Sequence, residues 1–451
     1  MSDVVYYGEQ TQLASDNFGG GRLPGELIRA YGMVKKACIL AIQQTEQGFS
    51  EPVFKAIISA ADSVINGQLD GQFPLSLMQG GAGTSINMNL NEVIASRARE
   101  LAGSVEIDPI ADINRYQSTN DTFPTAMTIV MSGRLADVEK LVVRLQEMLA
   151  AKEQEYASIL CVGRTEMQDA VPITLGQVFG AWAGAVERDR WRLNKIKERL
   201  RTIPLGGTAL GTCFSAPQAY IFAAERILRE ITGLPLSRSQ NLPDEISNAD
   251  KWNELASVFS ILAQNIIKIS GDLMIYTSSL CGELRHPALQ KASTIMAAKT
   301  NPVALEYAKG LCLSVVNDAR AVNDYACAGS LQLNPFLPFI LDKLLCISTD
   351  LRSALTMLND KFLPLVEPDC GRIEANLLRS NALLNVLLPV LGYAGVEKLH
   401  ADMKKTGPEN MADFRQLVEK AAGLGAEELD YYLDPFNATS PAKSRKPGGS
   451  L

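Results

Sequence analysis

Histidine is scarce in this chain. The 451 residues include only two histidines, His286 and His400, and no H-E-x-x-H segment. Two histidines cannot supply the multi-histidine sets that commonly hold zinc, so we expect no metal site of that kind. Any acid–base chemistry must therefore use other side chains.

Paired cysteines and long apolar runs are also missing. The eight cysteines are scattered, none forms a C-x-x-C pair, and most have apolar neighbours. This favours buried, reduced thiols over a metal site or a disulfide framework. No apolar run reaches about 18 residues, so we expect no membrane span. The first residues, Met-Ser-Asp-Val-Val, lack the basic and apolar regions of a secretory signal.

Positive charge is not in excess either. The net charge is −7, from 43 basic and 50 acidic residues, and no basic run precedes the C-terminal tail. No motif for reading DNA or RNA is visible. We therefore expect a cytoplasmic protein with neither a nucleic-acid nor a membrane partner.

Helical periodicity dominates the sequence, and no β-type alternation of comparable strength exists. The clearest pattern repeats at alternating steps of three and four residues, the spacing of helices packed side by side in a bundle. Further helical runs are expected over about 25–44, 51–66, 176–202, 302–328 and 340–360, with long helices from about Pro124 onward. We predict an all-α fold built on a long central helical bundle. The clearest pattern comprises Trp252, Leu255, Phe259, Leu262, Ile266, Ile269 and Leu273.

The chain is long enough for two or three domains. Proline and glycine residues interrupt the helical periodicity of the sequence at Pro364, Pro368 and Gly371. The tail is rich in Ser, Pro, Lys and Gly and is expected to be disordered. We predict a mostly helical N-terminal domain (1–118), a central bundle (119–366), a small C-terminal helical domain (367–438) and a tail (439–451).

Four polar clusters, far apart in the sequence, interrupt the helical patterns. Each has a simple structural interpretation: a helix cap after a glycine turn, a side-chain-capped turn around Asp121, a helix–helix connector, and a connector in which Asn301 caps a helix that starts at Pro302. The clusters are Gly83–Thr84–Ser85 with Asn87, Gln117–Asp121, Gly163–Asp169 and Ala292–Pro302.

The clusters also share a composition that suits ligand binding. Each is rich in hydroxyl and amide donors, and the last adds Lys299. Many neutral hydrogen bonds and one cation suit the binding of carboxylates. No competing motif for phosphate, nucleotide or metal is present, so the pattern predicts a helical bundle with a polar site for an anionic ligand.

In sequence order, these clusters resemble the motifs of the aspartase/fumarase superfamily, closest to the aspartate ammonia-lyase branch. The segment from Gly83 to Glu92, with Ser85 after Thr84, and the segment Ser118-Thr119-Asn120-Asp121 resemble the aspartase forms. Gly163-Arg164-Thr165 through Pro172 resembles the shared third block, and Ala292–Pro302 resembles the signature loop. The resemblance covers nearly the whole chain.

This resemblance implies a three-domain, all-helical homotetramer with a twenty-helix core and active sites assembled from three subunits. It implies cofactor-independent anti-elimination from a succinyl-type substrate to give fumarate, with Ser293 on a mobile loop as the base that removes the C3 proton. The dianionic aci-carboxylate that results needs preorganised electrostatic stabilisation. The positions implied to bind substrate are Thr84, Ser85, Ser118, Thr119, Asn120, Thr165, Lys299 and Asn301.

By the same resemblance, Ser85 and Thr119, which match the aspartase forms, imply L-aspartate as the substrate, giving fumarate and ammonia. Three alternatives stay open: a fumarate hydratase, a lyase of a substituted aspartate, and a non-catalytic relative like the lens crystallins of the superfamily. Intact Ser293, Lys299 and Asn301 argue against the last.

Two departures from the family pattern bear on the substrate. The signature loop has Ala292, Thr294, Ala297 and Ala298 at positions where the family has Gly, Ser, Pro and often Gly or Ala, which changes backbone freedom more than chemistry.

The second departure is Glu166, where relatives have His or Gln. The resemblance places Glu306 near that position, and two close carboxylates cannot both ionise cheaply, so we expect one of the pair to hold a proton. Glu166 and Glu306 are therefore candidate catalytic residues, together with Ser293 and Lys299 of the signature loop. Alternatively, a charged Glu166 recognises a cationic substrate or forms a salt bridge with Arg164 or another arginine.

Overall fold

The computed structural model describes residues 4–103, 105–290 and 293–441. Ala292, the first residue of the fourth polar cluster, and the predicted disordered tail from residue 442 lie outside these ranges. The all-α prediction is confirmed, since helices make up most of the described chain.

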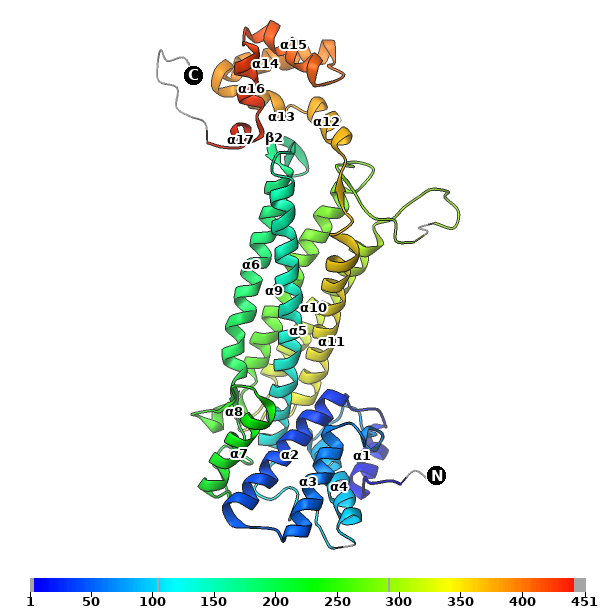
Figure 1. Cartoon of the computed structure of the whole chain (residues 1–451), viewed down its shortest axis with the longest axis vertical. Helices are drawn as coiled ribbons and strands as arrows, with labels where there is room; N and C mark the ends of the chain where they lie inside the picture. The colour runs from blue at the N-terminus through cyan, green and yellow to red at the C-terminus, as the bar shows by residue number, and fades with distance from the viewer. Residues whose placement is uncertain (1–3, 104, 291–292, 442–451) are drawn as a thin grey trace. The chain divides into compact units, whose positions relative to one another are not determined.

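The elements are mainly helices joined by short strands and loops (Figure 1). The helices are α1 (Glu9–Phe18), α2 (Gly25–Glu46), α3 (Glu51–Ile65), α4 (Thr84–Leu101), α5 (Thr119–Glu155), α6 (Leu175–Leu200), α7 (Gln218–Thr232), α8 (Leu242–Ser247), α9 (Asp250–Tyr276), α10 (Val303–Cys327), α11 (Leu337–Met357), α12 (Cys370–Arg379), α13 (Ala382–Asn385), α14 (Leu388–Thr406), α15 (Met411–Ala422), α16 (Ala426–Leu433) and α17 (Pro435–Ala438). The strands are β1 (Leu160–Thr165), β2 (Gln168–Thr174), β3 (Thr202–Ile203), β4 (Ser237–Arg238), β5 (Leu284–Arg285) and β6 (Glu367–Pro368).

The chain divides into two compact units. Unit 1 contains Met1–Lys140, Arg190–Gln264 and Cys312–Arg352, and unit 2 contains Leu141–Asp189, Asn265–Leu311 and Ser353–Leu451. The five long helices, α5, α6, α9, α10 and α11, each contribute a segment to both units. The three predicted domains stay a prediction.

Within unit 1, α2 packs on α3 and α7, and α3 packs on α4. The long-helix segments of this unit are joined by polar contacts at their surfaces. Lys197 of α6 pairs with Glu139 of α5 at 2.5 Å, and Lys343 of α11 pairs with Asp318 of α10 at 3.4 Å. Both pairs are partly exposed, whereas apolar residues of the same helices, such as Leu135, Ile196 and Leu344, are buried, as the predicted bundle packing requires.

Within unit 2, the long helices are joined in the same way. The indole N–H of Trp182 on α6 donates to Asp272 on α9 at 3.0 Å, and Asn265 on α9 donates to Asp189 on α6 at 2.7 Å. The remaining helices of this unit are α12 to α17, and α12 and α13 pack on the β1–β2 hairpin.

Helix α9 has the composition of a membrane span although none was expected. It is long and apolar enough to cross a membrane by length and composition alone, the one such helix among the described residues. All seven of its apolar residues at the three-and-four spacing are at most 3% exposed. A soluble bundle buries its central seam in this way, and we interpret α9 as a core helix of the bundle.

The β1–β2 hairpin was not expected from the sequence. The third polar cluster forms two antiparallel strands, with Thr165 paired to Gln168 and Glu166 and Met167 between them. Both turn residues have positive φ, 53° and 63°, as a tight two-residue hairpin turn requires. Such turns usually contain Gly, Asn or Asp, so Glu-Met carries no hairpin signal.

Candidate active site

The first polar cluster forms the start of α4. Gly81 and Gly83 have φ of 86° and 89°, and a Cβ on Gly83 would lie 2.8 Å from the Phe123 ring. The turn requires glycine for both reasons. Thr84 and Ser85 follow as the first helical residues, the former exposed and the latter half-buried. Their hydroxyls therefore lie at the positive end of an 18-residue helix, where anions are favoured.

The second cluster forms a capping box at the start of α5. The Ser118 hydroxyl accepts from the N–H of Asn120 at 3.2 Å, and Asp121 accepts from the N–H of Ser118 at 3.0 Å. The capped turn around Asp121 is thus confirmed, and α5 begins five residues earlier than Pro124 because this box starts it. The Asn120 amide donates to the carbonyl of Ala209 at 2.9 Å, and Thr119 is buried.

Asp121 joins this helix start by hydrogen bonds to a second loop, which contains Gly206 and Thr208. Its other carboxylate oxygen accepts from the N–H groups of Gly206 and Thr208 at 3.1 and 3.0 Å, and the residue is 0% exposed. Burial raises its pKa to about 7, although these hydrogen bonds and the cation of Lys35 favour the charged form. Asp121 is therefore a structural carboxylate that fixes the backbone of Ser118 and Asn120.

The third cluster places Thr165 and Glu166 at the exposed tip of the hairpin. Arg164, at the base of this tip, binds the fully buried Glu283 through two hydrogen bonds of 2.6 and 3.1 Å, and it also pairs with Asp169 at 3.2 Å. The Glu283 hydrogen bonds hold the pKa of the Arg164 guanidinium above its ordinary value. Arg164 is thus held by partners other than Glu166.

The fourth cluster forms a loop in which the Ser293 oxygen is an acceptor. The N–H groups of Ile295 and Met296 donate to it at 3.2 and 2.8 Å. Two backbone donors aimed at one oxygen are the arrangement that stabilises an oxyanion. Ser293 is half-buried, and Lys299, later in the loop, is exposed.

The loop ends at the start of α10. This helix begins at Val303, one residue later than expected, and the Pro302 carbonyl accepts from the N–H of Glu306 at 3.1 Å. Asn301 is half-buried, and Glu306 is exposed in the first turn. Among the described residues no hydrogen bond or ion pair joins Glu306 to Glu166, so that carboxylate pair stays a prediction.

The predicted site residues fall into two sets, one in each unit. The unit 1 set comprises Thr84, Ser85, Ser118, Thr119 and Asn120, and the unit 2 set comprises Thr165, Glu166, Ser293, Lys299, Asn301 and Glu306.

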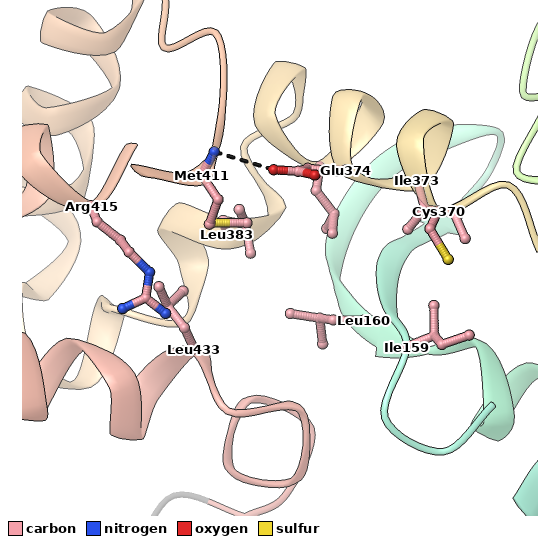
Figure 2. A pocket seen from close by; sticks show the side chains of 10 residues that line it. Ile159, Leu160, Cys370, Ile373, Glu374, Leu383, Met411, Arg415 and Leu433 are labelled. Atoms are coloured by element: carbon pink, nitrogen blue, oxygen red, sulfur yellow. Dashed lines mark hydrogen bonds between the residues drawn. The ribbon is translucent and has the colours of Figure 1, made fainter. Parts of the chain in front are cut away.

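A separate pocket of about 360 Å³ lies in unit 2 (Figure 2). Apolar side chains such as Leu160 and Leu383 line most of it, and at its edge Glu374 accepts from the N–H of Met411 at 3.2 Å. None of the predicted site residues lines this pocket. Among the described residues, no group of three His, Cys, Asp or Glu side chains is placed to hold a metal ion.

Replacing Ala298 with glycine should stabilise the ordered form of the signature loop. Ala298 has φ of 62°, where a Cβ costs about 1 kcal/mol, partly offset by the greater freedom of glycine. We expect slower proteolytic cleavage within the loop. Ala297 is not among the positive-φ residues, so Ala297→Gly should instead speed cleavage. Equal cleavage of both variants would contradict the strain assigned to Ala298.

Known proteins match the chain over nearly its full length. The family model described as "Lyase" matches residues 3–317. The aspartate ammonia-lyase of Bacillus subtilis (strain 168) is 34% identical, over 98% of this chain and 94% of the relative. The class II fumarate hydratase of Ralstonia nicotianae is 35% identical, over 95% of this chain and 94% of the relative. The structure titled "fumarate lyase:delta crystallin from Brucella melitensis bound to cobalt" superposes with a TM-score of 0.90 at 36% identity, covering 98% of this chain and 97% of that chain.

Fold and sequence together define a lyase. The chain belongs to the aspartase/fumarase superfamily, as the four motifs indicate.

Proposed function

We propose that this enzyme eliminates ammonia from L-aspartate to give fumarate. The observation that carries the proposal is the Ser293 oxygen, which accepts two backbone N–H groups in the loop that also bears Lys299. Ser85 and Thr119, at the starts of α4 and α5, favour an amino group over a hydroxyl as the leaving group, since both match the aspartase forms of their motifs. Curated relatives named as aspartate ammonia-lyases support this choice.

The elimination follows from the properties of these groups. The Ser293 oxyanion takes the proton from C3, and the C–H electron pair moves toward C4, whose carboxylate becomes a dianion. Lys299 and Asn301 supply a cation and a neutral donor that stabilise this charge. The C–N bond then breaks, and the C2–C3 double bond forms. Ammonia leaves with the bonding pair, and Ser293 retains the proton until it is returned to water.

Binding of the second carboxylate and the amino group is assigned to the helix starts of unit 1. Thr84 and Ser85 lie at the positive end of α4, and Ser118 retains its hydroxyl proton for donation while its oxygen caps α5. Thr119, Asn120 and, from the hairpin, Thr165 complete the donor set.

We extend the proposal to the assembly and the cellular location. The enzyme acts as a cytoplasmic homotetramer in which different subunits supply the two sets of residues. The motif resemblance supports this, and so does the match to relatives across whole chains. No cofactor takes part in the proposed reaction.

A screen for fumarate release tests the proposal. Ultraviolet absorbance of fumarate is followed with L-aspartate, L-malate and N-substituted aspartates, each with the purified full chain. Turnover of L-aspartate alone is expected. Turnover of malate but not aspartate would establish a hydratase, the candidate favoured by the class II fumarate hydratase relatives.

Glu166→Gln should keep or raise activity above neutral pH. An ionised Glu166 repels the substrate carboxylates, and glutamine keeps the side-chain volume while removing the charge. The measurement is kcat/KM for L-aspartate across pH. Asp169→Asn is the control. It also removes a carboxylate charge from the hairpin, but this carboxylate is already paired with Arg164. Complete loss of activity in Glu166→Gln would instead assign that carboxylate an active role, most simply the recognition of a cationic substrate.

A further inference from the structure

A lysine lies in the core of unit 1, on the apolar face of α2. Lys35 is 0% exposed, and no described ion pair includes it. Its ammonium donates to the side-chain oxygens of Asn114 and Gln117, each at 2.9 Å, and lies 5.6 Å from the centre of the Tyr31 ring. Burying an ammonium group without a carboxylate partner is costly, so the presence of a lysine at this buried position calls for an explanation.

The two acceptors are the ends of one strained turn. The N–H of Gln117 donates to the carbonyl of Asn114 at 3.0 Å, and the Asn114 amide donates back to the carbonyl of Gln117 at 3.2 Å. Between them, Tyr116 has φ of 62°, a conformation that bulky residues rarely adopt. The ammonium of Lys35 thus clamps both ends of a turn that contains an unfavourable backbone conformation at Tyr116.

This turn leads directly into the substrate-binding stretch. Gln117 is followed by Ser118, whose hydroxyl caps α5, and by Thr119 and Asn120. A shift in the turn therefore shifts the first turn of α5 and the hydroxyl and amide groups that it presents.

The same contact reaches the other helix start. The Asn114 oxygen accepts a second hydrogen bond, 3.0 Å, from the amide of Asn87, three residues after Thr84 on α4. One asparagine oxygen, held by the Lys35 cation, therefore joins the starts of α4 and α5. Both helix starts lie with α2 in unit 1.

We propose that Lys35 is a positioning residue that fixes the two carboxylate-binding helix starts relative to one another by clamping the Asn114–Gln117 turn. The proposal rests on the proposed function, since it takes those helix starts as the substrate-binding groups. Lys35 acts through the turn and does not touch the substrate.

The groups that face Lys35 determine when its cation is present. Asp121 from α5 and Cys38 on its own helix act on its charge, and the Tyr31 ring lies beside it. Tyr220 from α7 interacts with Cys38, and the neutral Asn87 from α4 contacts Asn114. Burial lowers the pKa of Lys35 to about 7. The clamp therefore loosens as the pH rises above 7, and wild-type KM should rise in that range more steeply than KM of a variant that lacks the amine.

The test compares Lys35→Met with Lys36→Met in the full-length enzyme. Methionine keeps an unbranched chain in the core, whereas Lys36, the next residue on α2, is partly exposed and pairs with Asp62 at 2.6 Å. We expect Lys35→Met to raise KM for L-aspartate by about ten- to a hundredfold with a smaller change in kcat. Lys36→Met should leave both constants within about twofold of wild type. A Lys35→Met enzyme with unchanged KM and an unchanged pH profile would overturn the proposal.

Two further measurements keep the proposal decidable. If wild type does not turn over aspartate, the Kd for succinate, an unreactive dicarboxylate, is measured for each variant in place of KM. This measurement separates failure of the present proposal from failure of the proposed reaction. If Lys35→Met does not assemble, Gln117→Met removes only one of the two clamped acceptors. It should weaken substrate binding by about threefold, and full affinity would overturn the proposal.

Discussion

Replacing Ser293 with alanine is expected to lower the rate of fumarate release by about two to four orders of magnitude. The substitution removes the oxygen that accepts hydrogen bonds from the N–H groups of Ile295 and Met296, and with it the proposed base. Ser293 lies in a loop and is half-buried, so little packing is lost. The measurement is kcat for L-aspartate at saturating substrate, with size-exclusion chromatography to monitor assembly.

A matched control lies next to this proposed base. Thr294 carries a neighbouring hydroxyl and is exposed, so Thr294→Ala should keep activity within about threefold of wild type. Near-normal activity in Ser293→Ala would remove the base assignment. A large loss in Thr294→Ala alone would move that assignment to the adjacent hydroxyl.

The second large effect is on stability at alkaline pH. Burial lowers the pKa of Lys35 from 10.5 to about 7 in the folded protein. Between these values the unfolded chain binds a proton at this lysine that the native state does not, so the contribution of Lys35 to stability rises with pH across this window. Relative to Lys35→Met, the free energy of unfolding of wild type should increase by about 4 kcal/mol between pH 7 and pH 10.

Asp121 titrates in the opposite sense and in a different window. Its pKa is raised from 3.8 to about 7, so its contribution lowers stability as pH rises from about 4 to about 7. Above pH 7, at one fixed protein concentration, the difference in urea unfolding between wild type and Lys35→Met therefore isolates the effect of Lys35, because buried thiols such as Cys161, whose pKa is also raised, are present in both proteins. Lys36→Met should run parallel to wild type. A Lys35→Met curve that is also parallel to wild type would show that Lys35 has an ordinary pKa.

The sequence predicts the helices well because their signal is local. The apolar spacing from Trp252 to Leu273 sets the buried seam of α9, and the glycine turn before Thr84 sets the start of α4. The Ser118–Asp121 capping box was also visible in the sequence, and its spacing marks the start of α5 more accurately than Pro124 does.

Other features depend on contacts between distant residues. The hairpin turn at Glu166 lacks the usual turn residues, and a register shift between Val162 and Arg164 interrupts the regular pairing of its strands. Glu283 appears in the sequence as one acid among many, and only the fold brings it to Arg164. The burial of Lys35 could be predicted from the sequence, because Lys35 follows Tyr31 by four residues and precedes Cys38 by three, which places it on the apolar face of its helix. A lysine at a core position predicts burial, but its partners are set by the turn at Asn114.

The most direct test of the proposed reaction is the stoichiometry of products from L-aspartate. Fumarate is measured by absorbance and ammonia by a coupled assay in the same sample of wild-type enzyme, with L-malate as a parallel substrate. We expect equal amounts of fumarate and ammonia from L-aspartate and no fumarate from L-malate. Fumarate from L-malate, with neither product from L-aspartate, would contradict the assignment as an ammonia-lyase.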